Sequence, residues 1–185
     1  MIVKRETIII LVIFLCLGLC YLVFGIDYDK TKKLDINYKN GNNVLIKNIL
    51  PVSDTIGKKY NGSGSEKNIQ ELKEFVIKND NDSKLSYTIY IKPNTVDSKT
   101  IKTNYIKVYL TDEFDKPLEG FEKNRVPAIS DLTVSNNNPD KLILYEGMIK
   151  KDEEQKFKLR SWLADSYAVT EEEQIYDFDI EIKNK

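Results

Sequence analysis

The stretch Tyr176-Asp177-Phe178-Asp179-Ile180-Glu181-Ile182-Lys183 decides the fold class of this chain. Its apolar side chains, at positions 176, 178, 180 and 182, alternate with charged side chains. Successive side chains of a β-strand point to opposite faces of the sheet, so a period of two predicts a strand with one buried and one solvated face.

Similar stretches recur throughout the preceding sequence. Within residues 105–110, Ile106, Val108 and Leu110 share one face and Tyr105, Lys107 and Tyr109 share the other. Residues 87–91 and 157–163 alternate in the same way. Further strands are predicted where β-branched and aromatic residues are concentrated, at 44–50, 75–79 and 142–149.

Turn-forming residues separate these stretches. They are Pro51, Asn61–Gly64, Asn79–Ser83, Pro93-Asn94, Lys116-Pro117 and Asn136–Asp140. About seven or eight short strands divided in this way predict an all-β domain over residues 44–185, an antiparallel β-sandwich of jelly-roll or immunoglobulin-like type. One helical segment is also expected, in which Ser65 caps a stretch with Ile69, Leu72 and Phe75 or Val76 on one face.

A hydrophobic run lies near the amino terminus. Residues 8–25, IIILVIFLCLGLCYLVFG, contain no charged or amide side chain. At about 1.5 Å per residue a helix of this length spans roughly 27 Å, close to the thickness of a bilayer's hydrocarbon core. We predict that residues 1–26 form one N-terminal transmembrane helix that anchors the chain. Cleavage after Gly25 as a signal peptide, and lipid modification at Cys16 or Cys20, stay open as alternatives.

The orientation of this segment follows from its flanks. Basic residues precede it at positions 4 and 5 and follow it at 30, 32 and 33, so positive charge lies on both sides. The tail before the run is short, and a long following domain is translocated largely regardless of its charge. We therefore predict a single-pass protein of the cell membrane with an extracytoplasmic domain. The polar residues 27–43 are predicted to form a stalk.

Composition excludes several classes of function. The chain has 28 basic and 29 acidic residues, whereas a nucleic-acid-binding surface needs a basic surplus. It contains no histidine, and Cys16 and Cys20 both lie inside the hydrophobic run. The domain thus lacks a Cys/His zinc site, a Ser-His or Cys-His nucleophile pair and a disulfide. We assign no catalytic, cofactor-binding or metal-binding residue, and we expect no enzymatic activity.

Acidic residues gather at two places in the domain. Asp112, Glu113 and Asp115 fall in a predicted hairpin loop, and Glu171–Glu173 precede the last strand. Carboxylate clusters can bind Ca²⁺, but neither has the residue order of a dedicated calcium loop. We interpret both as solvated turns. The stretch Asp54-Thr55-Ile56-Gly57 resembles the Asp-Thr-Gly of aspartic proteases only loosely, and the chain has no second copy of it.

The only tryptophan lies in the stretch 157–165. If Leu159 and Leu163 point inward, Arg160 and Trp162 share the opposite face. They can stack there as a cation–π pair, or that face can itself be buried. We expect a structural role for this pair rather than a ligand-binding one.

Several segments carry a resemblance to a known family. They are Pro51-Val52-Ser53-Asp54 with Gly57, Phe75–Asn79, Tyr87–Ile91, Leu144-Tyr145-Glu146-Gly147, Phe157–Asp165 and Phe178–Ile182. Together they resemble the TasA/camelysin type of exported proteins of Gram-positive bacteria. The resemblance implies a jelly-roll-like sandwich, export, and relatives that form fibres. Some members are described as metallopeptidases, but a chain without histidine offers no basis for carrying over a metal ligand or catalytic residue.

These features lead to one leading functional hypothesis. The chain is expected to be a structural or interaction module of the cell surface, held in the membrane by residues 8–25 and binding envelope or matrix proteins by edge-strand pairing. Two alternatives stay open, a surface hydrolase that uses carboxylates alone and an accessory or sensory subunit of a membrane complex.

Overall fold

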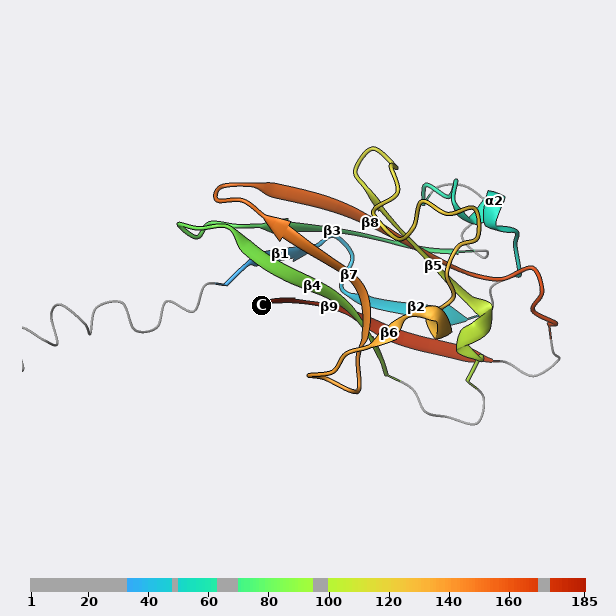
Figure 1. Cartoon of the computed structure of the whole chain (residues 1–185). Helices are drawn as coiled ribbons and strands as arrows, with labels where there is room; N and C mark the ends of the chain where they lie inside the picture. The colour runs from blue at the N-terminus through green and yellow to red at the C-terminus, as the bar shows by residue number, and fades with distance from the viewer. Residues whose placement is uncertain (1–32, 48–49, 63–69, 95–99, 170–173) are drawn as a thin grey trace, which may run out of the picture. The chain divides into compact units, whose positions relative to one another are not determined.

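The computed structural model describes residues 33–47, 50–62, 70–94, 100–169 and 174–185 (Figure 1). The hydrophobic run at 8–25, with Cys16 and Cys20, and most of the predicted stalk lie outside these residues. Within the described ranges, no helix is both long and apolar enough to cross a membrane. Residues from Leu34 to Lys185 make up one structural unit.

Two antiparallel sheets form this unit. The four-stranded sheet has the order β1 (Asp35–Tyr38), β3 (Gln70–Lys78), β8 (Glu154–Leu163) and β5 (Ile106–Asp112). The five-stranded sheet has the order β2 (Asn43–Lys47), β9 (Ile175–Asn184), β4 (Leu85–Pro93), β7 (Leu142–Ile149) and β6 (Thr133–Val134). Three short helical segments, α2 (Asp54–Gly57), η2 (Thr103–Tyr105) and η3 (Ile129–Asp131), lie between strands. The predicted antiparallel, all-β class is confirmed.

One hydrophobic core joins the two sheets, which gives the unit its sandwich-like character. The alternation that defines β9 places Tyr176, Phe178, Ile180 and Ile182 in this core. Tyr87 of β4 meets Phe157 of β8 edge to face, with 6.3 Å between ring centroids. Burial of such side chains stabilises a fold by about 1.5–3 kcal/mol each. The alternating apolar residues of the sequence therefore supply the hydrophobic burial that stabilises the packing of the two sheets.

Two segments differ from the prediction. The helical segment expected around Leu72, Phe75 and Val76 is wrong for its described part, because β3 is paired with β1 on one side and β8 on the other. Ser65 and Ile69 lie outside the described residues. In addition, β1 falls within residues 27–43, where a stalk is predicted. Ile36 and Tyr38 of β1 pack against the core. Two apolar residues that alternate with polar ones are too short a pattern to predict a strand within a polar stretch.

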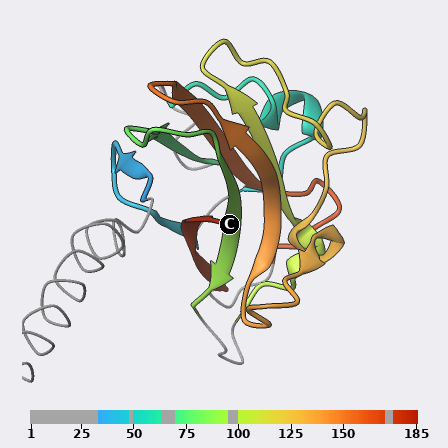
Figure 2. The same ribbon diagram turned by 60° about the vertical axis from the view of Figure 1, so that its left-hand side comes forward.

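Two of the short connections between the sheets are linked to each other. Residues 79–84 connect β3 to β4, and residues 150–153 connect β7 to β8. Figure 1 and Figure 2 both show these turns side by side at one end of the sheets. The main chain links them, since the Asn79 N–H donates to the Glu153 carbonyl (3.1 Å) and the Asp152 N–H donates to the Asn79 carbonyl (2.9 Å).

The side chain of Asn79 completes this junction. It has no solvent exposure. Its amide nitrogen donates to the carbonyl oxygens of Ser83 (2.9 Å), Lys150 (3.1 Å) and Ile149 (3.3 Å). Its amide oxygen accepts the N–H of Asn81 (3.1 Å). A single buried amide therefore binds main-chain groups of both turns.

We expect Asn79→Ala to lower the free energy of unfolding by about 3 kcal/mol, because it removes hydrogen bonds of a buried side chain to three main-chain carbonyl groups. Denaturant-induced unfolding followed by circular dichroism measures this change. Asn136→Ala is the matched control, since Asn136 is exposed, and should change stability by less than about 0.5 kcal/mol. Equal effects of the two substitutions would contradict the role given to Asn79.

Candidate functional site

The outer face of the four-stranded sheet is covered where β8 ends. Trp162 has no exposed surface and lies against α2. A Cβ atom added to Gly57 would come within 2.2 Å of the indole ring, so only glycine allows this close approach. The face that Arg160 and Trp162 share is buried, which was one of the two alternatives left open by the sequence.

Arg160 holds three segments together beneath this cover. Its guanidinium donates to the Tyr60 carbonyl (2.6 Å), to the Thr111 hydroxyl (3.1 Å) and to the Asp115 carboxylate. Only 2% of the Arg160 side chain is exposed, so these bonds compensate for its removal from water. Arg160 thus fixes the loop after β5 and the segment after α2 onto the sheet, as the expected structural role requires.

The carboxylates of the loop after β5 are directed to different partners. Asp112 accepts the N–H groups of Phe114 and Lys116, each at 2.9 Å, and so closes the turn. Glu113 pairs with Lys156 at 3.2 Å. Asp115 pairs with Arg160, whose hydrogen bond lowers the pKa of the Asp115 carboxyl below its usual range. Each carboxylate is engaged by its own partner, which favours the interpretation of this loop as a turn.

Other acidic residues singled out in the sequence do not join this loop. The Asp54 carboxylate accepts the Val126 N–H at 3.1 Å, and so ties α2 to a neighbouring loop. Glu171–Glu173 lie outside the described residues. Across the part of the chain that the structure describes, no group of three His, Cys, Asp or Glu side chains could hold a metal ion.

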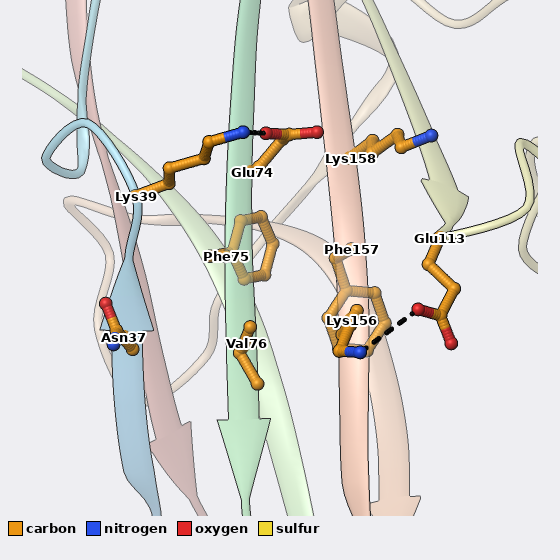
Figure 3. A pocket seen from close by; sticks show the side chains of 9 residues that line it. All are labelled: Asn37, Lys39, Glu74, Phe75, Val76, Glu113, Lys156, Phe157 and Lys158. Carbon is orange, nitrogen blue, oxygen red and sulfur yellow. Dashed lines mark hydrogen bonds and ion pairs between the residues drawn. The ribbon is translucent and has the colours of Figure 1, made fainter.

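A groove of about 480 Å³ runs over β1, β3 and β8 on this sheet (Figure 3). It is lined by Asn37, Lys39, Glu74, Phe75, Val76, Glu113, Lys156, Phe157 and Lys158. Lys39 pairs with Glu74, and Lys156 with Glu113, as the dashed lines in Figure 3 mark. Lys158 pairs with Asp115 at 3.0 Å. Each lysine that lines the groove is thus engaged in an ion pair.

A second groove of about 330 Å³ adjoins the first, and Lys39 and Glu74 line both. Burial raises the pKa of Glu71 in this second groove above the usual range of a glutamate carboxyl. Its neighbour Glu74 is engaged by Lys39 at 2.5 Å. Glu71 and Glu74 line the same groove, and Glu74 is committed to an ion pair.

The edge of β2 presents main-chain groups with no described strand beside them. The Ile180 N–H donates to the Asn42 carbonyl (2.9 Å), so Asn42 and Ile180 are a hydrogen-bonded pair. Hydrogen-bonded and non-hydrogen-bonded pairs alternate along an antiparallel ladder such as that between β2 and β9. Val44 and Ile46 consequently exchange hydrogen bonds with β9. The N–H and C=O groups of Asn43 and Leu45 point the other way, where no described strand pairs with β2.

The other edge strands are less available. Main-chain hydrogen bonds to Pro127 and from Leu118 cover the outer edge of β5. Strand β6 has only two residues, Thr133–Val134. Strand β1 has four residues, and its outward-directed groups belong to Ile36 and Tyr38, whose side chains are half-buried. The part of β7 beyond Ile143 is likewise paired with no described strand on the side of β6, because β6 pairs only with Leu142 and Ile143. Strand β2 is an edge strand over all of its five residues, and its Leu45 side chain is 41% exposed.

The sequence predicts a strand over 44–50 but gives no sign that this strand lies at an edge, because strand order depends on contacts between distant residues. Comparison of the chain with protein-family models, with curated proteins and with solved structures finds no match. The resemblance to the TasA/camelysin type therefore stays a prediction. The proposed function rests on the arrangement of the described residues.

We expect the pairing of Asp115 with Arg160 to make stability depend on pH. A carboxyl whose pKa is lowered in the folded state stabilises that state above about pH 4, the unfolded value, and this contribution is lost as pH falls through the folded value. Asp115→Asn should therefore be less stable than the unsubstituted chain at pH 7, with a difference that narrows below pH 4. Asparagine also tolerates the positive φ of this position (64°).

Thermal unfolding at a series of pH values measures this difference. Asp165→Asn, at an exposed position, serves as the control and should show no such dependence. If the difference in stability between Asp115→Asn and the unsubstituted chain is the same at pH 7 and pH 3, the charge of Asp115 does not contribute to stability.

Proposed function

We propose that this protein is a membrane-anchored, extracytoplasmic interaction module that binds other cell-surface proteins through the uncovered edge of β2. The observation that carries the proposal is the row of outward main-chain groups at Asn43 and Leu45, next to an exposed Leu45 side chain. An added strand would continue the five-stranded sheet, with main-chain hydrogen bonds supplying affinity and side chains supplying specificity.

The unprotected character of this edge supports a binding role. Natural sheets usually shield their edges with proline, inward-pointing charges, bulges or covering loops, because an open edge invites pairing with other chains. Strand β2 contains no proline, and its only charged side chain is that of Lys47, its last residue. Val44 and Ile46 point into the core, which holds the strand in one register. The contrast with the covered edge of β5 favours selection for pairing at β2.

The membrane part of the proposal is supported by the sequence. The run at 8–25 has the length and composition of a spanning helix, and the structural unit begins shortly after it, at Leu34. Two of the crossings between sheets, β3 to β4 and β7 to β8, are joined by main-chain hydrogen bonds, an arrangement that supports a sandwich of the jelly-roll type that the TasA/camelysin resemblance implies.

The proposal predicts the outcome of cross-linking on intact cells that display the full chain. A membrane-impermeant, amine-reactive cross-linker should join the chain to surface proteins. Leu45→Pro should reduce these adducts at least several-fold, because proline removes an outward N–H without touching the ladder to β9. Leu45→Thr keeps that N–H and is the matched control, so its adducts should persist.

Two outcomes would overturn the proposal. If the cross-linker reaches the chain only after cells are broken, the domain is not extracytoplasmic. If Leu45→Pro forms the same adducts as the unsubstituted chain while its circular dichroism is unchanged, the edge of β2 is not the binding site.

A further inference from the structure

We infer that the partner of the β2 edge is a second copy of this chain, paired antiparallel about a two-fold axis that passes beside Val44. This inference rests on the proposed function, since it assigns the occupant of the same edge. It follows from the pattern of outward groups, the side chains that would meet, and the position of nearby charges.

The outward main-chain groups of β2 are complementary to themselves. With the axis beside Val44, Asn43 of one copy lies opposite Leu45 of the other, and Leu45 lies opposite Asn43. In an antiparallel ladder each such pair exchanges two hydrogen bonds. The N–H and C=O groups of Asn43 and Leu45 would therefore all be satisfied on both copies, with none left over.

This register does not depend on Lys47, the last residue of β2. An axis beside Leu45 would place Lys47 opposite Asn43, and Lys47 already takes part in an interaction within its own chain. The axis beside Val44 uses only groups that face outward at positions 43 and 45. The Val44-centred register is therefore the better match.

The side chains that meet in this register are compatible. On the outer face, the exposed Leu45 lies beside Asn43 of the other copy, so an apolar group is covered and no like charges face each other. The Asn43 amide is held in place by hydrogen bonds to Asp177 (2.5 Å) and Asp179 (3.2 Å). On the inner face, the two Val44 side chains lie opposite each other and extend the core.

Electrostatic repulsion between Asp177 and Asp179 of one copy and the same two residues of the other copy would be weak. Across the interface the order of strands is β9, β2, β2 and β9, so the two β9 strands are separated by three strand spacings, about 14 Å. This exceeds the Debye length of about 8 Å at physiological ionic strength. The carboxylates of Asp177 and Asp179 therefore do not oppose pairing of two copies.

The surface buried between the two β2 strands is small, so the dimer should form where the chain is concentrated. Two short edge strands bury less than the roughly 1,200–2,000 Å² typical of stable interfaces, so pairing in dilute solution should be weak. Copies held in one bilayer share a thin layer, which raises their effective concentration. We expect dimers when the full chain is embedded in a membrane.

Cysteine cross-linking tests this pairing and its register. The full chain, with Cys16→Ser and Cys20→Ser to remove the native thiols, is reconstituted in lipid vesicles and oxidised. Val44→Cys should form a disulfide-linked dimer, because opposed residues of this kind have Cβ atoms about 4.5–5.5 Å apart, close enough to bridge after small adjustments. Leu45→Cys should not, since the two Leu45 positions are diagonal, at about 7–8 Å.

Further variants link the cross-link to the edge. In the Val44→Cys background, Leu45→Pro should reduce dimer yield at least several-fold, and Leu45→Thr should leave it nearly unchanged. Unfolding curves of each variant show whether it is folded. A folded Val44→Cys chain that stays monomeric, or a Leu45→Cys chain that cross-links equally well, would overturn the inference.

The same variants separate failure of this inference from failure of the proposed function. If Val44→Cys gives no dimer but Leu45→Pro still removes adducts on intact cells, the β2 edge binds a different protein and the proposed function stands. If Leu45→Pro changes neither measurement, both fail.

Discussion

The buried amide of Asn79 is the interaction on which the rest of the structure depends. It ties the β3–β4 turn to the β7–β8 turn through the carbonyl groups of Ser83, Ile149 and Lys150. The pairing of β3 with β8 and of β4 with β7 starts from these two turns and extends away from them. One side chain thus sets the relative position of the central strands of both sheets, and hydrophobic burial between those strands stabilises the arrangement.

This junction also determines which surfaces are left open. With β3 and β8 fixed at the centre of one sheet, Arg160 and Trp162 fall on an outer face that α2 and the neighbouring loops cover. Those loops also cover the edge of β5. On the other sheet, β9 enters between β4 and β2 and leaves β2 at the margin. The proposed binding edge is therefore a consequence of strand order rather than of any local motif.

Much of this fold could be predicted from the sequence, for a physical reason. Alternation with a period of two in β5, β8 and β9 reports which side chains face the core between the sheets, and it predicts both the fold class and the shared face of Arg160 and Trp162. The spacing of Leu72, Phe75 and Val76 fits a helix as well as a strand, and only the hydrogen bonds of β1 and β8 decide between them. The role of Asn79 and the edge position of β2 depend on contacts between residues far apart in sequence, which no local pattern contains.

The most direct test of the role of Asn79 compares the unfolding of the two sheets in the unsubstituted chain. Fluorescence of Trp162, the only tryptophan, follows the four-stranded sheet, and amide hydrogen exchange in β4 and β9 follows the five-stranded sheet. If Asn79 joins the sheets into one cooperative unit, both signals should change over the same range of denaturant concentration. Loss of exchange protection in β4 and β9 while Trp162 fluorescence remains native would contradict it.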